Sequence, residues 1–534
     1  MGELSFRQRL AFGMAGITMN LPDMVFMQWL LVRYVRPGEM QPLVPPLLFG
    51  VIVLFARIME AIANPVVGHW SDQTRTKWGR RMPYLRLGII PFVVVFSLLF
   101  APPVDHLHWM NVAWVFVLLQ CYLYLYAVII TPYLALLPEI SSNLKERVDL
   151  TTYQSVFIML GTFLFAAMGA ILNTYGWTKA SLLVSALALL CFLPVCTLIR
   201  EREHPSISKE EHMGLFASAR LALKNQPFRC VFGATALFWY GLNGLIVLVP
   251  VWVLSYLGRD EGAVTMVMLP FLLVNLAFFF VFNALAGKFG KYVLMQVTFL
   301  AGAVVMASIA LVGILPIGSE FIQTAVIMSL FGIPAAGFMV LPFAVLADVV
   351  DYDEKLTGRR REALYVGGQG VAQKIMIGLS MLSFTIVPYL GSDGTQTLRE
   401  GGALVISGSY SPQEGTAIPS DSVAPATEYA PGVVRISPKP ASINAPWRLS
   451  GPDGIVREGK GPAELTDLPR GKYAIEWKEV AGWTVPQPAK QPTPFGLKLM
   501  ALLCGAACVC GFLVFLRYPI REKDGKTYFV GQTC

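Results

Sequence analysis

Long apolar runs separated by short polar stretches cover most of the chain. There are twelve such runs, each of about 20 residues, which is the length that a membrane-spanning helix requires. The pattern predicts an all-α polytopic membrane protein with 12 transmembrane helices in two six-helix halves. The runs span approximately Leu10–Tyr34, Leu43–Val67, Tyr84–Pro102, Asn111–Leu137, Leu150–Leu172, Ser181–Ile199, Val231–Leu257, Val264–Leu285, Val293–Leu315, Phe321–Leu346, Ala363–Leu390 and Phe495–Phe515.

One polar stretch is far longer than an ordinary connection between neighbouring helices. Residues 391–493 are rich in Gly, Pro and Ser, and beyond about Pro440 apolar and polar residues alternate as they do in strands. Tyr473, Ile475 and Trp477, for example, recur at every second position. We expect a flexible linker up to about Pro440, followed by a small β-rich, sandwich-like domain between helices 11 and 12.

These patterns divide the chain into six parts, whose sides of the membrane follow from the basic residues. With the N-terminus inside, most Lys and Arg fall in cytoplasmic loops, as the positive-inside bias requires. This places both termini in the cytoplasm, the insert outside, and the protein in the inner membrane of a prokaryote. The parts are an N-terminal six-helix half (1–199), a cytoplasmic linker (200–229), helices 7–11 (230–390), an extracytoplasmic linker and β-rich domain (391–493), helix 12 (494–518) and a cytoplasmic tail (519–534).

Composition agrees with a membrane protein and argues against other classes. Hydrophobic residues make up 55% of the chain and charged residues 14%, whereas soluble domains carry about 25% charged residues. The net charge of +8 therefore reflects cytoplasmic loops, and we expect no nucleic-acid partner. The eight cysteines lack the spacing of a zinc site, and no nucleophile–base pair is apparent. We expect neither an enzyme nor a metal site nor a cofactor.

Four ionisable side chains lie well inside the apolar runs, where charges are costly and usually face a cavity. Asp23 lies in the first run, Arg57 and Glu60 in the second and Lys374 in the eleventh. Arg57, Glu60 and Asn64 share one helical face. An uncompensated lysine at this depth would be unfavourable by about 2.5–3.5 kcal/mol, so Lys374 requires Glu60 or Asp23 as a partner. For Asp23, a local cap or ion pair near the interface is the alternative to a cavity-facing role.

Two charged stretches connect helices on the expected cytoplasmic side. Residues 68–83 carry basic residues between glycines, and residues 347–362 carry acidic residues followed by three arginines. We predict that both are loops, and that acidic residues of one half pair with arginines of the other to close the cytoplasmic side. A solvated loop of mixed charge is the alternative. The candidate gate residues are Asp72, Arg75, Arg80, Arg81, Asp348, Asp351, Asp353 and Arg360.

Three strings carry a resemblance to a known family. They are RIMEAIANPVVGHWSDQTRTKWGRRMP (Arg57–Pro83), PYLALLPE (Pro132–Glu139) and DVVDYDEKLTGRRRE (Asp348–Glu362). Their order and spacing resemble the glycoside–pentoside–hexuronide cation symporters, the melibiose permease-like branch of the major facilitator superfamily. The resemblance covers about Ser5–Leu390 and the last helix, but not the insert. It implies the major facilitator fold and cation-coupled sugar transport.

The resemblance also implies roles for individual residues. Ion or proton coupling would involve Glu60, Asn64, Arg57 and Thr131, with H⁺ or Na⁺ as the ion, because burial disfavours a charged carboxylate and carboxylate oxygens suit Na⁺. In melibiose permease the positions matching Glu60 and Asn64 are both aspartates, which favours protons or uniport here. The matching sugar-binding carboxylates fall at Asn20 and Ile130, and an arginine is replaced by Gln154. The candidate substrate residues are Asn20, Asp23, Gln154, Trp239, Tyr240, Gln373 and Lys374.

Three functions remain in competition at this point. The first is cation- or proton-coupled symport of a small glycoside-like solute, and the second is lipid or lysolipid transport by the same fold. The third is a membrane scaffold or sensor without transport, with the outer β-rich domain as its interaction module. That domain is either a passive packing module or one that binds carbohydrate or another cell-envelope partner. We expect a monomer in contact with membrane lipid and a small-molecule substrate.

Overall fold

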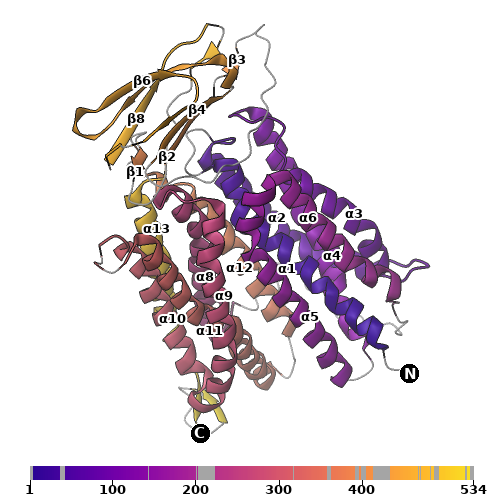
Figure 1. Cartoon of the computed structure of the whole chain (residues 1–534). Helices are drawn as coiled ribbons and strands as arrows, with labels where there is room; N and C mark the ends of the chain where they lie inside the picture. The colour runs from indigo at the N-terminus through magenta and orange to yellow at the C-terminus, as the bar shows by residue number, and fades with distance from the viewer. Residues whose placement is uncertain are drawn as a thin grey trace.

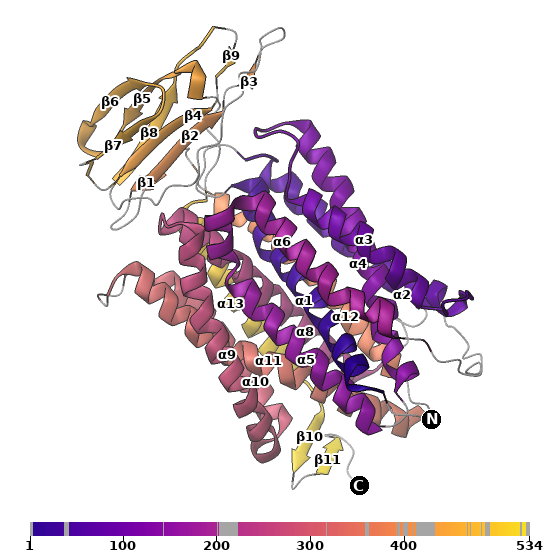
Figure 2. The same ribbon diagram turned by 45° about the vertical axis from the view of Figure 1, so that its right-hand side comes forward.

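Figure 1 shows the chain in a computed structural model, with two groups of long helices below a small β-sheet domain. Both chain termini lie at one end of the helices and the sheet domain lies at the other, as Figure 2 also shows. We refer to these as the terminal end and the β-domain end. The structure describes residues 4–36, 42–141, 144–199, 201, 223–314, 316, 318–357, 362–390, 392, 396–398, 404–409, 411–412, 433–439, 441–466, 468–469, 471–481, 483–485, 492–523 and 526–529.

Within the described residues, twelve helices are long and apolar enough to cross a membrane, which confirms the predicted fold class. Successive helices run in opposite directions between the two ends. The first half comprises α1 (Phe6–Val35), α2 (Pro46–Gln73), α3 (Met82–Leu99), α4 (Trp109–Ile140), α5 (Leu144–Ala166) and α6 (Met168–Leu198). The second comprises α8 (Gln226–Val251), α9 (Glu261–Phe289), α10 (Lys291–Ser308), α11 (Glu320–Thr357), α12 (Glu362–Phe384) and α13 (Pro494–Phe515).

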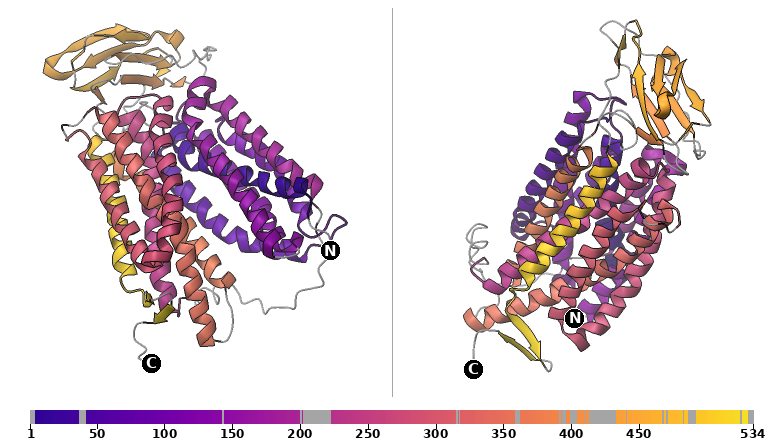
Figure 3. Two further views of the ribbon diagram at one scale, coloured as in Figure 1. Left: turned by 60° about the horizontal axis from the view of Figure 1, so that its bottom comes forward. Right: turned by 90° about the vertical axis from the view of Figure 1, so that its left-hand side faces the viewer.

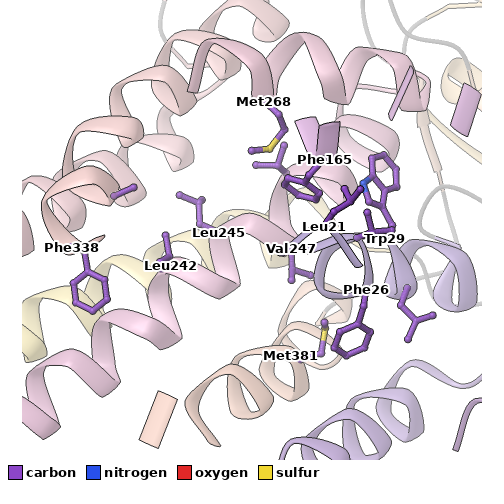
Figure 4. Packing of buried hydrophobic residues seen from close by; sticks show 14 of the residues in the cluster. Leu21, Phe26, Trp29, Phe165, Leu242, Leu245, Val247, Met268, Phe338 and Met381 are labelled. Atoms are coloured by element: carbon purple, nitrogen blue, oxygen red, sulfur yellow. The ribbon is translucent and has the colours of Figure 1, made fainter. Parts of the chain in front are cut away.

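The halves meet at mid-depth and at the β-domain end. At the β-domain end, α6 approaches α9 so closely that a Cβ on Gly169 would lie 2.2 Å from the carbonyl oxygen of Glu261. Asn173 donates a hydrogen bond to Asp260 across the same boundary at 3.1 Å. Apolar residues of α1, α5, α8, α9 and α12 join in one cluster, part of which is drawn in Figure 4. Toward the terminal end the ribbons of the two halves diverge (Figure 3, left).

Two predicted loops are partly helical, which corrects the sequence-based boundaries. Helix α2 continues to Gln73, so Asp72 lies on its last turn, and α11 continues to Thr357. The reason is that the helical period persists into the charged stretches. Val345, Val349 and Asp353 are all buried at intervals of four residues, which keeps one face of α11 packed.

The insert between α12 and α13 forms a β-sandwich-like domain, as predicted, but its strands begin earlier than expected. The supposed linker before Pro440 already contains β1 (Gln396–Leu398), β2 (Leu404–Ser409), β3 (Ser411–Pro412) and β4 (Val434–Lys439). A four-stranded sheet has the order β1-β8-β5-β6 and a three-stranded sheet the order β2-β4-β7. The remaining strands are β5 (Pro446–Ser450), β6 (Val456–Lys460), β7 (Ala463–Leu465), β8 (Gly471–Trp477), β9 (Trp483–Thr484) and, in the tail, the hairpin β10 (Ile520–Lys523) and β11 (Lys526–Phe529).

The domain has a hydrophobic core of its own. Ile406 and Ile436 of one sheet pack with Trp447, Tyr473 and Trp477 of the other. Strands β2 and β4 pair in parallel although 24 residues separate them, a pairing that alternation along the sequence does not reveal. The period-two pattern that predicted strand β8 arises because Tyr473 and Trp477 lie on the face of the strand that is buried in this core.

The two ends of the insert are fastened to each other at the rim of the helices. The backbone N–H of Thr493 donates to the carbonyl of Pro388 at 2.7 Å, and its hydroxyl donates to the carbonyl of Leu390 at 2.9 Å. The same hydroxyl accepts a hydrogen bond from the N–H of Gly496, capping α13. We call this contact the stem.

Replacing residues 396–485 by a short Gly-Ser linker is expected to leave the helical bundle folded. The stem holds α12 and α13 together without the sheets, and shortening a loop changes its closure free energy by only about 0.6 kcal/mol per halving. Size-exclusion profiles and melting curves in detergent should match those of the full chain. Aggregation of the shortened chain, with the stem residues retained, would show that the sheets support the helices.

Candidate functional site

Four charged side chains meet at mid-depth, where the two halves face each other. Arg57 donates to Glu60 from its Nη1 at 2.7 Å and lies 3.4 Å from Asp23. Lys374 of α12 donates to the other carboxylate oxygen of Glu60. Two acids and two bases thus form one cluster with no net formal charge, which lets ionised groups persist in an apolar bundle. We call Asp23, Arg57, Glu60 and Lys374 the central cluster.

Burial divides the central cluster into an inner and an outer pair. The side chains of Glu60 and Arg57 are 0% and 3% exposed, whereas those of Asp23 and Lys374 are 29% and 21% exposed. The outer pair therefore presents one carboxylate and one ammonium group to whatever enters between the halves. Of the two predicted partners of Lys374, Glu60 is the one that pairs with it, whereas Asp23 forms an ion pair with Arg57.

Local structure explains how these groups come together. Arg57 and Glu60 lie three residues apart near the middle of α2, so they share one face. Helix α12 reaches that face because Gly378, one turn beyond Lys374, has no side chain. A Cβ on Gly378 would lie 3.1 Å from Cα of Leu54 and 3.3 Å from Cβ of Arg57, so a larger residue would push the two helices apart.

Aromatic residues surround the buried arginine, and sequence reasoning missed them. The guanidinium of Arg57 lies 4.8 Å from the ring centre of Phe26, a cation–π geometry that stabilises a buried cation. Tyr122 of α4 packs on Phe26 with ring centres 5.4 Å apart. The hydroxyl of Tyr122 is buried and has no hydrogen-bond partner among the described residues. In the sequence these positions look like any other apolar residue of a membrane helix.

Asn64 and Thr131, predicted to assist coupling, are brought together one turn below Glu60. The hydroxyl of Thr131 donates to the side-chain oxygen of Asn64 at 3.3 Å. Both lie on the terminal side of the central cluster, on α2 and α4. Their oxygens extend the polar face of α2 without adding a charge.

Two candidate substrate residues have contacts within the first half. Asn20 donates to the carbonyl of Ile158 at 3.0 Å and to the hydroxyl of Thr162 at 2.7 Å, which ties α1 to α5. Gln154 of α5 is buried, with its amide 4.0 Å from the sulfur of Met19. Their roles in substrate binding remain predictions.

The other candidate substrate residues lie in the second half. Trp239 of α8 is half-buried and meets Phe338 of α11 edge to face, with ring centres 5.4 Å apart. Tyr240 and Gln373 are also half-buried, and Gln373 directly precedes Lys374 on α12. Substrate contact by these three also remains a prediction.

At the terminal end, the basic residues of the first predicted loop pair within their own half. Arg81 contacts Asp72 at 2.9 Å and Glu139 at 3.1 Å, and Arg80 also contacts Glu139. Arg80 reaches Glu201 at 3.4 Å, and the backbone N–H of Arg81 donates to Glu201 at 2.9 Å. Glu139 lies in the last turn of α4 and Glu201 follows α6, so this network joins the C-terminal ends of α2, α4 and α6 to the N-terminal end of α3. Neither acid was assigned from the sequence, because only the fold brings them to the arginines.

The acidic residues expected to face those arginines lie on α11. Asp348 pairs with Lys291 of α10, in the same half, at 2.6 Å. Asp351 is exposed and Asp353 is buried, and Arg360 lies outside the described residues. The pairing found for Asp348 thus differs from the expected inter-half pairing, and Arg75 is exposed. The gate role of these residues stays a prediction.

The described part of the chain contains no group of three or more His, Cys, Asp or Glu side chains placed to hold a metal ion. The carboxylates at mid-depth face an arginine and a lysine rather than other metal ligands. The contacts of the central cluster are ion pairs and hydrogen bonds between side chains of the protein.

Comparison with known proteins agrees with this architecture. A family described as MFS/sugar transport protein matches residues 11–407, which include eleven of the twelve long helices and end in β2. The isoprimeverose transporter of Lactiplantibacillus pentosus is 27% identical over 345 residues, covering 62% of this chain and 70% of that protein. The sodium-dependent lysophosphatidylcholine symporter 1-B of Danio rerio is 24% identical over 404 residues, covering 66% and 75%.

Solved structures show the same fold. A crystal structure of a D-xylose–proton symporter superposes with a TM-score of 0.53 and 17% sequence identity, over 72% of this chain and 91% of that one. The sequence match spans both halves, and the twelve helices have the order that the symporter resemblance implies. The chain therefore belongs to the MFS/sugar transport protein family of the major facilitator superfamily, as a multi-pass membrane protein.

Proposed function

We propose that the chain is a secondary active transporter that moves a small glycoside-like solute together with a cation or proton by alternating access. The observation that carries this proposal is the ion pair between Glu60 and Lys374. It joins the two halves at mid-depth, where transporters of this kind place substrate and ion sites. Such a pair forms and breaks as the halves move, so it can link a change of charge to a change of conformation.

The arrangement of the halves supports an inward-facing state. Contacts such as Asn173–Asp260 hold the β-domain end together, whereas the ion pairs named at the terminal end lie within each half. Basic residues gather at the terminal end, including Lys145, Arg147 and Lys288, and the positive-inside bias favours a cytoplasmic location for that end. We infer cytoplasmic termini, an external β domain and a monomer in a prokaryotic inner membrane.

The β domain supports a packing role better than a carbohydrate-binding one. Trp447, Trp477 and Trp483 all lie in its core, and sugar-binding surfaces commonly present exposed aromatic rings. On the outer face of the four-stranded sheet, Arg448 lies opposite Glu458 and Glu476. A cell-envelope partner that binds these charges remains our alternative for this domain.

The test is binding and accumulation by the purified chain. Labelled glycosides, disaccharides and lysophosphatidylcholine are added to proteoliposomes under an imposed H⁺ or Na⁺ gradient, with vesicles lacking protein as the control. A glycoside that binds should stabilise the folded chain by about 2.7 kcal/mol at a concentration of 100 Kd. Its addition should therefore raise the melting temperature, and the glycoside should accumulate against its gradient.

Stabilisation and uptake of lysophosphatidylcholine alone would establish the second candidate function, which the similarity to the lysophosphatidylcholine symporter favours. Binding of a solute without any flux would refute transport and support the scaffold or sensor hypothesis. Uptake at the same rate with and without the H⁺ and Na⁺ gradients would indicate uniport rather than symport.

A further inference from the structure

Both carboxylate oxygens of Glu60 are occupied by cations that belong to the protein. One accepts from Arg57 at 2.7 Å and the other accepts from Lys374. With a fully buried side chain, Glu60 has its negative charge offset from two directions. A free cation that sought this carboxylate would have to displace one of them.

The two cations are not equivalent. Arg57 belongs to the same helix as Glu60, also contacts Asp23 and stacks on Phe26, and is buried. Lys374 comes from the other half and is partly exposed, and Glu60 is its one hydrogen-bond and ion-pair partner among the described residues. Lys374 is therefore the cation of the central cluster that can leave when the halves separate.

The surroundings of Glu60 are poorly suited to a metal cation. Na⁺ is a hard cation that needs several oxygen ligands and gains most from a site with excess negative charge. The central cluster has no excess charge, and the next polar residue on the same face, Asn64, is a neutral amide whose oxygen accepts from Thr131. A Na⁺ ion here would meet two positive charges within a few ångströms.

We propose that the ammonium group of Lys374 takes the place of Na⁺ as the counter-ion of Glu60, so that the transporter works without Na⁺. This inference rests on the proposed function for its meaning in transport, but the binding property is independent of flux. The cation that a Na⁺ symporter takes from solution is here tethered to the second half. Protons then remain as the ions that can change the charge of the cluster, at Glu60 or Asp23, with Arg57, Lys374 and the hydroxyls of Tyr122 and Tyr126 as the surrounding titratable groups.

Melting curves of the purified chain in NaCl, KCl and choline chloride at equal ionic strength test the inference. The native chain should melt at the same temperature in all three. Lys374→Met and Asn64→Asp each give the site one excess negative charge, and each should gain a stabilisation by Na⁺ that saturates with concentration. Lys374→Arg keeps the tethered charge and should remain indifferent to Na⁺.

The controls separate this effect from mere loss of a lysine or of the fold. Lys498→Met removes a membrane-helix lysine that donates to the carbonyl of Val312, and it should gain no response to Na⁺. Asn64→Asp retains Arg57, Glu60 and Lys374. If Lys374→Met does not fold, Asn64→Asp still tests whether an excess negative charge creates a response to Na⁺.

Two results would overturn the inference. One is Na⁺-specific stabilisation of the native chain that disappears in Glu60→Gln. The other is a pair of folded variants, Lys374→Met and Asn64→Asp, that respond to acid but not to Na⁺. If the melting temperatures respond to Na⁺ as expected but the chain transports no solute, the proposed function is refuted, whereas the role of Lys374 as counter-ion of Glu60 is supported.

Discussion

Replacement of Glu60 by Gln abolishes uphill accumulation of the substrate and leaves exchange across the membrane partly intact. This is the expected result, because the amide keeps the size of the side chain but cannot gain or lose a charge. The ion pair with Lys374, which joins the halves, becomes a weaker neutral contact. The measurement is the ratio of internal to external labelled solute at steady state under an imposed gradient, which should fall to about one, together with the rate of counterflow.

A matched control comes from the β domain. Glu458 also faces one arginine and one lysine, Arg448 at 3.5 Å and Lys478 at 3.6 Å, but its side chain is 54% exposed. Glu458→Gln should leave accumulation unchanged, since exposed ion pairs contribute little. Undiminished accumulation by Glu60→Gln would remove Glu60 from the coupling role.

Loss of Arg57 is expected to have the largest effect on stability. Arg57→Met leaves Asp23 and Glu60 with Lys374 as their one cation in the central cluster, so that a buried negative charge is uncompensated. Breaking a buried ion pair in this way costs about 3–5 kcal/mol. We expect a large fall in the yield of folded protein and in the melting temperature in detergent.

Arg259→Met provides the comparison for that variant. Arg259 is exposed and lies 5.9 Å from the ring of Phe321, so it shares the aromatic contact of Arg57 without its burial. Exposed substitutions of this kind usually change stability by less than about 0.5 kcal/mol. If Arg57→Met had the same melting temperature as the native chain, the guanidinium of Arg57 would not be what stabilises the buried carboxylates of Asp23 and Glu60.

The sequence predicted the helices well because a membrane imposes a length and a composition on every span. It also predicted the pairing of Lys374, since a lysine in the middle of an apolar run requires an acid and few acids lie at that depth. The contact of Asp23 with Arg57 was harder to predict from the sequence. It depends on the rotation of α1 against α2, which side-chain packing sets.

Other features depended on contacts that no local pattern records. Glu201 reaches the turn at Gly79, where φ is +107° and a Cβ would lie 2.3 Å from the carboxylate. The glycine was visible in the sequence, but its neighbour was not. In the same way Asn20 and Gln154, which family resemblance makes candidates for the substrate site, have contacts between α1 and α5 that the sequence does not reveal.

The stem gives the chain a feature that structural work on small transporters usually has to engineer. Most of a twelve-helix bundle is hidden in a detergent micelle, which leaves little for image alignment in electron microscopy. Here a domain with its own core stands outside the helices, with both of its ends fastened at Pro388 and Thr493. It is a built-in fiducial mark, and a position where a larger reporter protein can be grafted without cutting a helix.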